Sequence, residues 1–216
     1  MTQSPDPHAG GHDAPQISPA EALQRLKDGN ERFLRGTSRF TGMDTTTLDA
    51  LAGGQQPFAT LLGCADSRVP PELIFDAVLG ELFVVRVAGN VLSPEVAGSL
   101  QYAGAHLRTP IFVVLGHEGC GAVSAALQSH RKGVQHLSRI QLLVDSILPA
   151  IADVSDKLPP QQQLAAAVEA NVRHQIAAIR DSPEARAREA SGGFLLIGAI
   201  YDLATGRVRW LDERNV

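Results

Sequence analysis

The sequence has little cysteine, since only Cys64 and Cys120 occur among its 216 residues. This excludes the small scaffolds that depend on several disulfides. The chain also lacks a strong charge of either sign. Its net charge of −4 gives no electrostatic reason to expect nucleic acid or an anionic membrane as a partner. No apolar run approaches the ~18 residues that a membrane-spanning helix needs. We therefore expect no nucleic-acid partner and no membrane partner.

The first stretch, MTQSPDPHAGGHDAPQ, lacks the basic and apolar segments of a secretory signal, which predicts a cytoplasmic protein. It is rich in Pro, Gly and His, so residues 1–16 are expected to form a disordered tail. In such a tail His8 and His12 are more readily explained as exposed residues than as metal ligands. Residues 17–216 contain no repeat and no linker, and their length suits a single domain.

Apolar, β-branched stretches alternate with helical patterns along the rest of the chain. We expect strands at residues 58–62, 82–87, 111–115 and 194–202, and helices at residues 45–52, 72–75, 96–107, 119–128, 140–152 and 161–180. Strands that are apolar on both faces and separated by helices predict an α/β fold, with a mainly parallel central sheet of four strands covered on both faces. The turn signal at Thr205 and Gly206 predicts that residues 208–211 add a C-terminal antiparallel edge strand.

A further helix is expected at the N-terminus. Ser18, Pro19 and Glu21 are typical of a helix start, with Ser as the cap and Glu at the third position. Apolar residues then recur on one face, at Ala22, Leu23, Leu26, Phe33 and Leu34. This helix has no strand of its own, so it either covers the surface of its own domain or reaches across to a partner subunit as an arm.

Residues typical of metal chemistry follow two of the predicted strands. Cys64, Asp66 and Arg68 alternate in the stretch LLGCADSR, and His117 and Cys120 end the stretch IFVVLGHEGC. The carboxyl ends of parallel strands meet at one edge of a sheet, where ligands gather. The two cysteines could instead form a disulfide or be inert buried thiols. The ligand-type residue beside each of them favours a metal site.

Two cysteines and a histidine are typical zinc ligands. A closed structural site would usually add a fourth Cys or His, and the chain has no third cysteine. The fourth position is therefore left to water or to Asp66. Three protein ligands with one open position are typical of catalytic zinc.

At these residues the chain resembles the β-class carbonic anhydrases. The similarity covers CADSRVPPELIF, GELFVVRVAGN, QYAGAHL and VVLGHEGCGAV, from about residue 55 to residue 127. The resemblance implies reversible hydration of CO2 to bicarbonate and a proton, by attack of zinc-bound hydroxide on CO2. It also implies a homodimer or a dimer of dimers, joined in part by the N-terminal arm.

The resemblance also implies roles for individual residues. Cys64, His117 and Cys120 match the zinc ligands, and Asp66 and Arg68 match the catalytic dyad. The dyad would hold Asp66 off the metal at neutral pH, so that the site stays open.

Four further positions match substrate-binding residues, three of them in the pocket wall of a plant-like subgroup: Gln55, Phe83, Tyr102 and Gly121. Without the resemblance, the first three would read as an exposed loop residue, a core aromatic and an aromatic on a helix face.

The sequence departs from the family pattern at two places. Val87 stands where the family commonly has Asn, just before the turn at residues 88–90. Leu61 stands where one subgroup has the Trp of a non-catalytic bicarbonate site, although Arg86 matches the Arg of that site; the only Trp is Trp210. We therefore expect no such bicarbonate site. Considered by itself, Arg86 is either a surface strand residue or part of a structural ion pair.

Two other functions are compatible with the same residues. A zinc enzyme on this scaffold could hydrolyse carbonyl sulfide or carbon disulfide. A non-enzymatic zinc-binding module is the other alternative, and it predicts a closed metal site without an exchangeable water. The intact pair Asp66 and Arg68 argues against that module.

Overall fold

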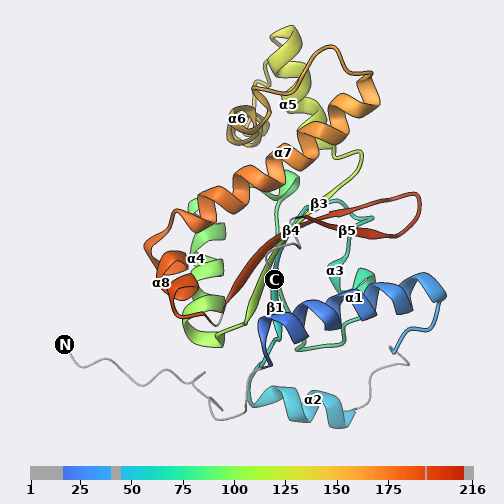
Figure 1. The fold of residues 1–216 in the computed structure, drawn as a ribbon, viewed down its shortest axis with the longest axis vertical. Coiled ribbons are helices and arrows are strands. Elements are labelled where there is room, and N and C mark those ends of the chain that lie inside the picture. The colour runs from blue at the N-terminus through green and yellow to red at the C-terminus, as the bar shows by residue number, and fades with distance from the viewer. Residues whose placement is uncertain (1–16, 40–44, 193, 212–216) are drawn as a thin grey trace.

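The computed structural model describes residues 17–39, 45–192 and 194–211 (Figure 1). The expected tail at residues 1–16 lies outside these ranges. A five-stranded sheet with the order β2-β1-β3-β4-β5 forms the centre. Its strands are β1 (Ala59–Gly63), β2 (Leu82–Arg86), β3 (Ile111–His117), β4 (Leu195–Tyr201) and β5 (Val208–Leu211). The first four run parallel and β5 pairs antiparallel with β4, which confirms the predicted sheet.

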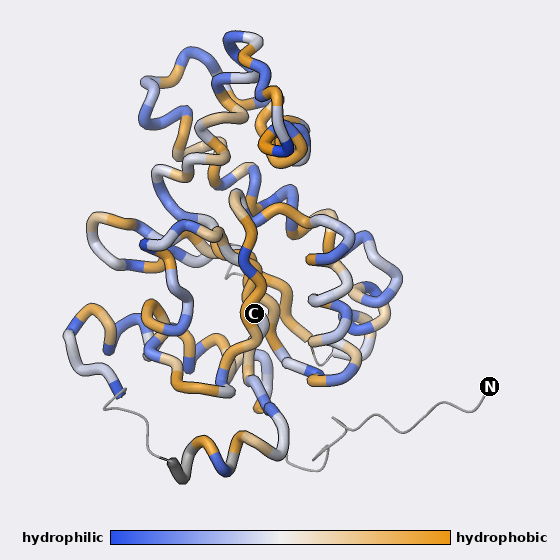
Figure 2. Tube along the Cα trace, turned by 180° about the vertical axis from the view of Figure 1, so that it is seen from behind, coloured by the Kyte–Doolittle hydropathy of each residue, from blue (hydrophilic) through white to orange (hydrophobic). Residues whose placement is uncertain are grey.

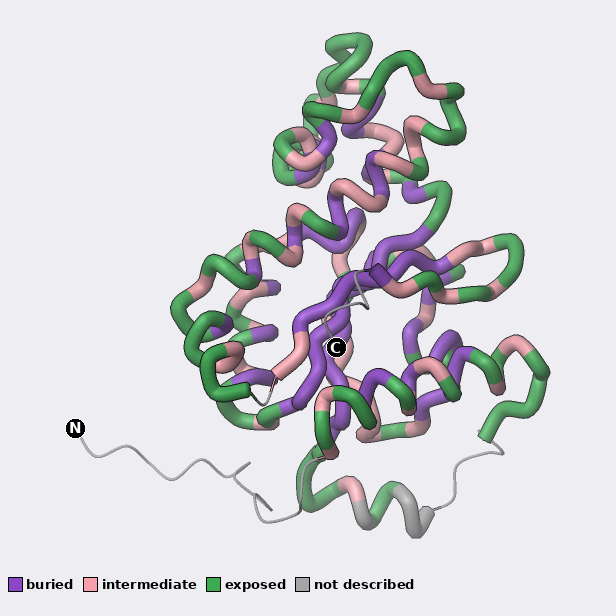
Figure 3. The backbone as a smooth tube through the Cα atoms, in the orientation of Figure 1, coloured by how far each residue is buried: buried purple, intermediate pink, exposed green. Residues whose placement is uncertain are grey.

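The central strands are buried on both faces. Every residue of β1 and β3 is buried, as expected for parallel strands with cover on each side (Figure 3). Figure 2 shows the corresponding run of hydrophobic residues through the middle of the molecule. Leu62 and Val114 face one core cluster, whereas Leu61 and Val113 face the other. The alternation along each strand thus divides the core into two layers.

Helices cover the face of Leu62 and Val114. They are α4 (Pro94–Tyr102), α5 (Gly121–Lys132), α6 (Ile140–Ile151), α7 (Pro160–Arg180) and α8 (Pro183–Ala190). The expected helix at residues 96–107 is divided in two, because α4 ends at Tyr102 and passes into the π-helical turn η2 (Ala103–Leu107). The helix α8 was not expected. Its sequence has no apolar periodicity that could predict it, because Ala185 is the one residue it buries. Ser182 caps its N-terminus by accepting a hydrogen bond from the N–H of Ala185.

Short elements complete the chain: α2 (Thr45–Ala52), α3 (Pro71–Ile74) and the 3-10 turn η1 (Ala88–Asn90). Among the described residues, no helix is long and apolar enough to cross a membrane.

The N-terminal helix α1 (Pro19–Arg35) covers the other face of the sheet. Ser18 and Glu21 form the predicted capping box. Leu23 and Leu26 are buried in the same cluster as Leu61 and Val113. A Cβ at position 29 would lie 1.9 Å from the carbonyl oxygen of Phe75, so glycine there permits close contact with the end of α3. Of the two expected arrangements, the structure has the one in which this helix covers its own domain.

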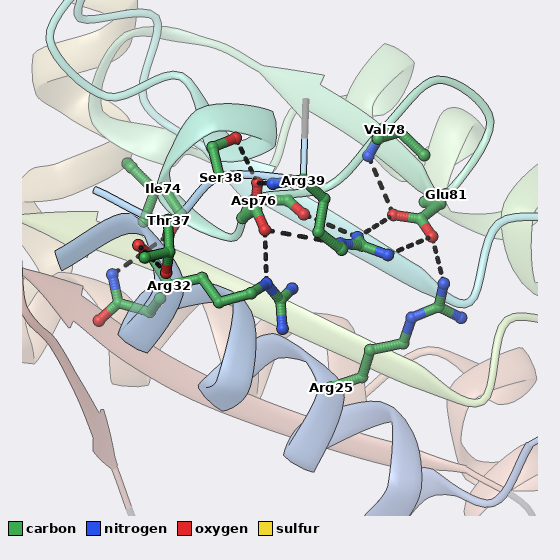
Figure 4. Close-up of polar contacts among 10 residues, drawn as sticks. Arg25, Arg32, Thr37, Ser38, Arg39, Ile74, Asp76, Val78 and Glu81 are labelled. Carbon is green, nitrogen blue, oxygen red and sulfur yellow. Dashed lines mark hydrogen bonds and ion pairs between the residues drawn. The ribbon is translucent and has the colours of Figure 1, made fainter. Parts of the chain in front are cut away.

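The carboxylates of Asp76 and Glu81 connect α1 and the residues after it to the loop that follows α3, through hydrogen bonds and ion pairs (Figure 4). Asp76 accepts hydrogen bonds from Ser38 Oγ at 2.6 Å, from the backbone N–H of Arg39 at 2.9 Å and from Arg32 Nε at 2.5 Å. Glu81 accepts from Arg39 Nη2 at 2.7 Å and from Arg25. Burial raises the pKa of Asp76, but these donors outweigh it, so the pKa of this carboxyl lies below its ordinary value.

Candidate metal centre

Three ligand-type side chains meet at the carboxyl edge of the sheet. Cys64 follows β1 directly, His117 is the last residue of β3, and Cys120 precedes α5. The strands β1 and β3 are neighbours, with Gly63 opposite Leu115, so their ends bring the three residues together. The ligand atoms all lie within 4.8 Å of one another, and the side chains are 4%, 0% and 1% exposed in chain order. The structure thus brings together the three predicted zinc ligands.

The histidine is prepared to bind a metal. His117 Nδ1 lies 2.9 Å from the carbonyl oxygen of Glu118. If Nδ1 carries the proton and donates it there, Nε2 has a free lone pair. Nε2 is buried and has no hydrogen-bond partner among the described residues. A buried polar atom without a partner costs free energy, and a metal ion would remove that cost.

The two thiols share a proton in the absence of a metal. A hydrogen bond from Cys120, aided by the backbone N–H of Gly89, lowers the pKa of the Cys64 thiol to about 4. The hydrogen bond to Cys64, together with burial, raises the pKa of the Cys120 thiol. A cation among the three atoms would replace the shared proton. One nitrogen and two sulfurs at this spacing are a donor set that fits zinc.

Asp66 and Arg68 lie beside this cluster as a two-point ion pair. Arg68 Nε donates to Asp66 Oδ1 at 2.9 Å, and Nη2 donates to Oδ2 at 2.7 Å. The backbone N–H of Arg68 adds a third bond at 3.0 Å. These bonds hold the pKa of the Asp66 carboxyl well below its ordinary range. Asp66 Oδ2 lies 3.9 Å from His117 Nε2, next to the metal position, while both oxygens are bound by Arg68. This is the geometry that an open site requires.

Arg86 supports the loop that carries the pair. Its Nε donates to the carbonyl oxygen of Cys64 at 2.9 Å and its Nη2 to that of Asp66 at 2.6 Å. Of the two interpretations of Arg86, the surface strand residue is confirmed, since Arg86 is the exposed last residue of β2, and the ion pair is not found among the described residues. The matching Trp position, Leu61, is fully buried, and Trp210 lies against Phe75 with 6.0 Å between ring centroids.

A set of buried amides supports the cysteine from behind, and the sequence analysis missed it. The N–H of Gly89, in η1, points at Cys64 Sγ with a separation of 3.4 Å. The carbonyl oxygen of Gly89 accepts from Asn171 Nδ2 at 2.9 Å, and Asn171 Oδ1 accepts from Gln175 Nε2 at 3.0 Å. Gln175 Oε1 in turn accepts from the N–H of Leu92 at 2.9 Å. The only sequence signal was the presence of two amides one turn apart on the apolar face of a helix.

The expected pocket wall is not assembled around the ligands of the same chain. Phe83 and Tyr102 do pair, with 6.2 Å between ring centroids. Phe83 lies opposite Thr60, however, four residues before Cys64 and therefore roughly 13 Å away along the strand. Gln55 is exposed and precedes β1. Gly121 alone of the four adjoins the site, because it directly follows Cys120.

Comparison with known proteins agrees with this geometry. A family model described as carbonic anhydrase matches residues 59–208. Carbonic anhydrase 2 of Mycobacterium tuberculosis is 38% identical over 203 residues, which cover 92% of this chain and 96% of that protein. The carbonic anhydrase of Mycolicibacterium smegmatis is 36% identical over 198 residues, covering 90% and 94%. The solved β-carbonic anhydrase of Coccomyxa, in complex with acetazolamide, superposes with a TM-score of 0.70 at 30% identity, covering 88% of this chain and 86% of that one.

Proposed function

The chain belongs to the β-class carbonic anhydrases and catalyses the reversible hydration of carbon dioxide, and we propose that Asp66 and Arg68 are the dyad that orients the attacking water. Zinc, held by Cys64, His117 and Cys120, supplies Lewis acidity that makes water a nucleophile near neutral pH. Carbon dioxide and bicarbonate are the substrate and the product.

Asp66 acts by accepting a hydrogen bond, not by removing the proton. A carboxyl whose pKa lies well below its ordinary range is a poor proton acceptor near neutral pH. Its position beside His117 Nε2 still lets it accept a hydrogen bond from water at the metal position. That bond would direct the oxygen lone pair towards carbon dioxide. Arg68 fixes the carboxylate at two points and so keeps it from becoming a fourth metal ligand.

The two-point pair beside the three ligands is the observation that carries this proposal. The test is stopped-flow hydration of carbon dioxide by zinc-loaded wild-type protein and by the Asp66→Asn variant. Asn keeps the size and one acceptor but loses the charge that pairs with Arg68. We expect a large loss of turnover with unchanged zinc content. Full activity in the variant would refute the orienting role. Carbonyl sulfide and carbon disulfide in the same assay test the alternative substrates.

We also propose that the enzyme is a homodimer or a dimer of dimers in the cytoplasm. If Phe83 and Tyr102 are wall residues, a second copy must bring its own pair to this site, since one chain holds them far from its own ligands. The strand β2, which carries Phe83, is only partly buried and forms an edge of the sheet in the described part of the chain, where such contact can occur. Sedimentation at equilibrium tests this association, and a well-folded monomer would overturn it.

A further inference from the structure

A cavity of about 450 Å3 lies at the opposite end of the sheet from the metal ligands. Its lining residues come from α4, η2, the end of α7, α8, the start of β3 and the segment just before β4. Phe112, on its wall, is five residues before His117 on the same strand and therefore roughly 17 Å from it. Its volume suits a small organic molecule, and it is separate from the zinc site.

The wall of this cavity carries a cation, Arg188, that has no counter-ion among the residues the structure describes. The Arg188 guanidinium carbon lies 4.4 Å from the centre of the Phe194 ring and 5.3 Å from that of Phe112. Its Nη2 donates to the carbonyl oxygen of Thr109 at 2.8 Å, whereas Nη1 is buried and has no hydrogen-bond partner among the described residues. Arg188 also forms no ion pair within the part of the chain that the structure describes. A partly buried guanidinium stays charged, so its desolvation is compensated only in part.

A second arginine lies at the rim. Arg108 follows η2 with a φ of 53°, so the backbone there is left-handed. Its side chain is exposed, lines the same cavity and pairs with no carboxylate of the described chain. Glu184, the one carboxylate among the lining residues, forms no ion pair with either arginine. The cavity therefore presents more positive than negative charge.

The rest of the wall is mostly apolar. Leu100, Ile179 and Ala185 line it together with the two phenylalanine rings. An inorganic anion would pair with the arginines but leave this apolar surface in contact with water. An uncharged hydrocarbon would cover the apolar surface but leave the arginines without a counter-ion. A ligand that satisfies both needs a single carboxylate and a compact aromatic or branched body.

We propose that this cavity is a binding site for a small organic monocarboxylate. Arg188 and Arg108 receive the carboxylate, and the apolar body lies against Phe112, Phe194 and Leu100. The site requires no zinc and rests on residues that have no part in the hydration reaction, so it stands apart from the proposed function.

Fluorine NMR titration of zinc-loaded, full-length protein with 4-fluorobenzoate tests the site. We expect saturable binding that weakens about tenfold or more in Arg188→Met, because Met keeps an apolar stem on the rings but removes the charged donors. The matched control is Arg186→Met, an exposed arginine of the same helix, which should bind as wild type does. Turnover of carbon dioxide should be unchanged in both variants.

The titration also distinguishes binding in this cavity from binding at the zinc. Carboxylates can also reach zinc, but binding there would persist in Arg188→Met and would overturn the proposal. Equal affinity for 4-fluorobenzyl alcohol would contradict the role of charge. If Arg188→Met does not fold, Ala97→Phe, which fills the cavity from α4, provides the second test. Undiminished binding in that variant, or no saturable binding to wild-type protein, would also refute the site.

Discussion

Asn171, buried in α7, donates a 2.9 Å hydrogen bond to the carbonyl oxygen of Gly89, whose own N–H points at the sulfur of Cys64. The residue whose N–H contacts the ligand sulfur is thus held by a side chain that lies 82 residues after it in the chain. Gly89 has a φ of 73°, a backbone conformation that favours glycine, and a Cβ there would also crowd Ala122 Cβ at 3.1 Å, so a side chain would strain this turn. The metal centre is positioned from α7 as well as from the strand ends.

Replacing Asn171 with Leu should therefore weaken both the fold and the hold on zinc. The variant leaves the buried carbonyl oxygen of Gly89 and the Nε2 group of Gln175 without these partners, which costs about 1–3 kcal/mol for each group. We expect a lower free energy of unfolding in urea and faster loss of zinc to a chelator. Gln162→Leu, at an exposed position of the same helix, is the control and should behave as wild type. Unchanged zinc release in Asn171→Leu would contradict the positioning role.

Removing one thiolate tests the ligand set directly. Cys120→Ser replaces a soft, charged sulfur by a hydroxyl, which binds zinc poorly and stays protonated near neutral pH. We expect zinc content well below one per chain after dialysis, measured by elemental analysis. Ser124→Ala, one turn further along α5, controls for the purification and should keep its zinc. Full zinc in Cys120→Ser would show that the sulfur is not a ligand.

For hydration activity, we expect the two-point geometry of the Arg68 guanidinium to matter more than its charge alone. Arg68→Ala removes every side-chain donor to Asp66, so the pKa of that carboxyl should rise towards its ordinary value and the carboxylate should be free to turn to the metal. We expect most hydration activity to be lost with zinc retained. Arg68→Lys restores the charge but not the two-point geometry, and should recover only part of the activity. Wild-type turnover in Arg68→Ala would rule out this role.

The sequence was sufficient for the sheet and the ligands because both leave strong signals. Apolar β-branched runs are uncommon outside strands. Cys64, His117 and Cys120 are of residue types that bind zinc, and their spacing after two strands made a metal site the favoured interpretation. The predicted strand at residues 111–115 nevertheless ended too early, since Gly116 resembles a strand end. In the structure Gly116 lies inside β3, and it is a glycine because a Cβ there would meet Val172 Cγ2 at 2.6 Å. That requirement comes from α7, which no local pattern reveals.

What could not be predicted depends on contacts between distant segments. Asn171 and Gln175 are polar residues on the apolar face of a helix, and only their contacts with η1 and Leu92 reveal their structural role. The cavity lined by Arg188 likewise depends on α8, whose sequence has no apolar periodicity. Long-range packing decided the function of these residues, whereas local chemistry decided that of the zinc ligands.

The carboxylate of Asp76 should make the stability of the fold depend on acid pH. Its side chain is 1% exposed, and it is paired with Arg32 and Arg39, which are 29% and 38% exposed. The pKa of Asp76 is lower in the folded chain than the ~3.9 of an unfolded one. Its contribution is therefore fully present above about pH 4 and is lost as the pH falls through the lower folded value. Asp76→Asn removes the charge and leaves Arg32 without its carboxylate partner, whereas Arg39 keeps its ion pair with Glu81.

We expect Asp76→Asn to lower the free energy of unfolding near pH 7 by about 2 kcal/mol. This is less than the roughly 3–5 kcal/mol for a fully buried pair, because the arginines are partly in water. The difference from wild type should shrink as the pH falls below about 4, because Asp76 of the unfolded wild-type chain then binds a proton that the folded chain still excludes. Urea unfolding of both proteins between pH 7 and the acid limit of the fold measures this. Asp153→Asn, an exposed acid after α6, is the control. A difference that stays constant with pH would show that Asp76 stabilises α1 by shape and not by charge.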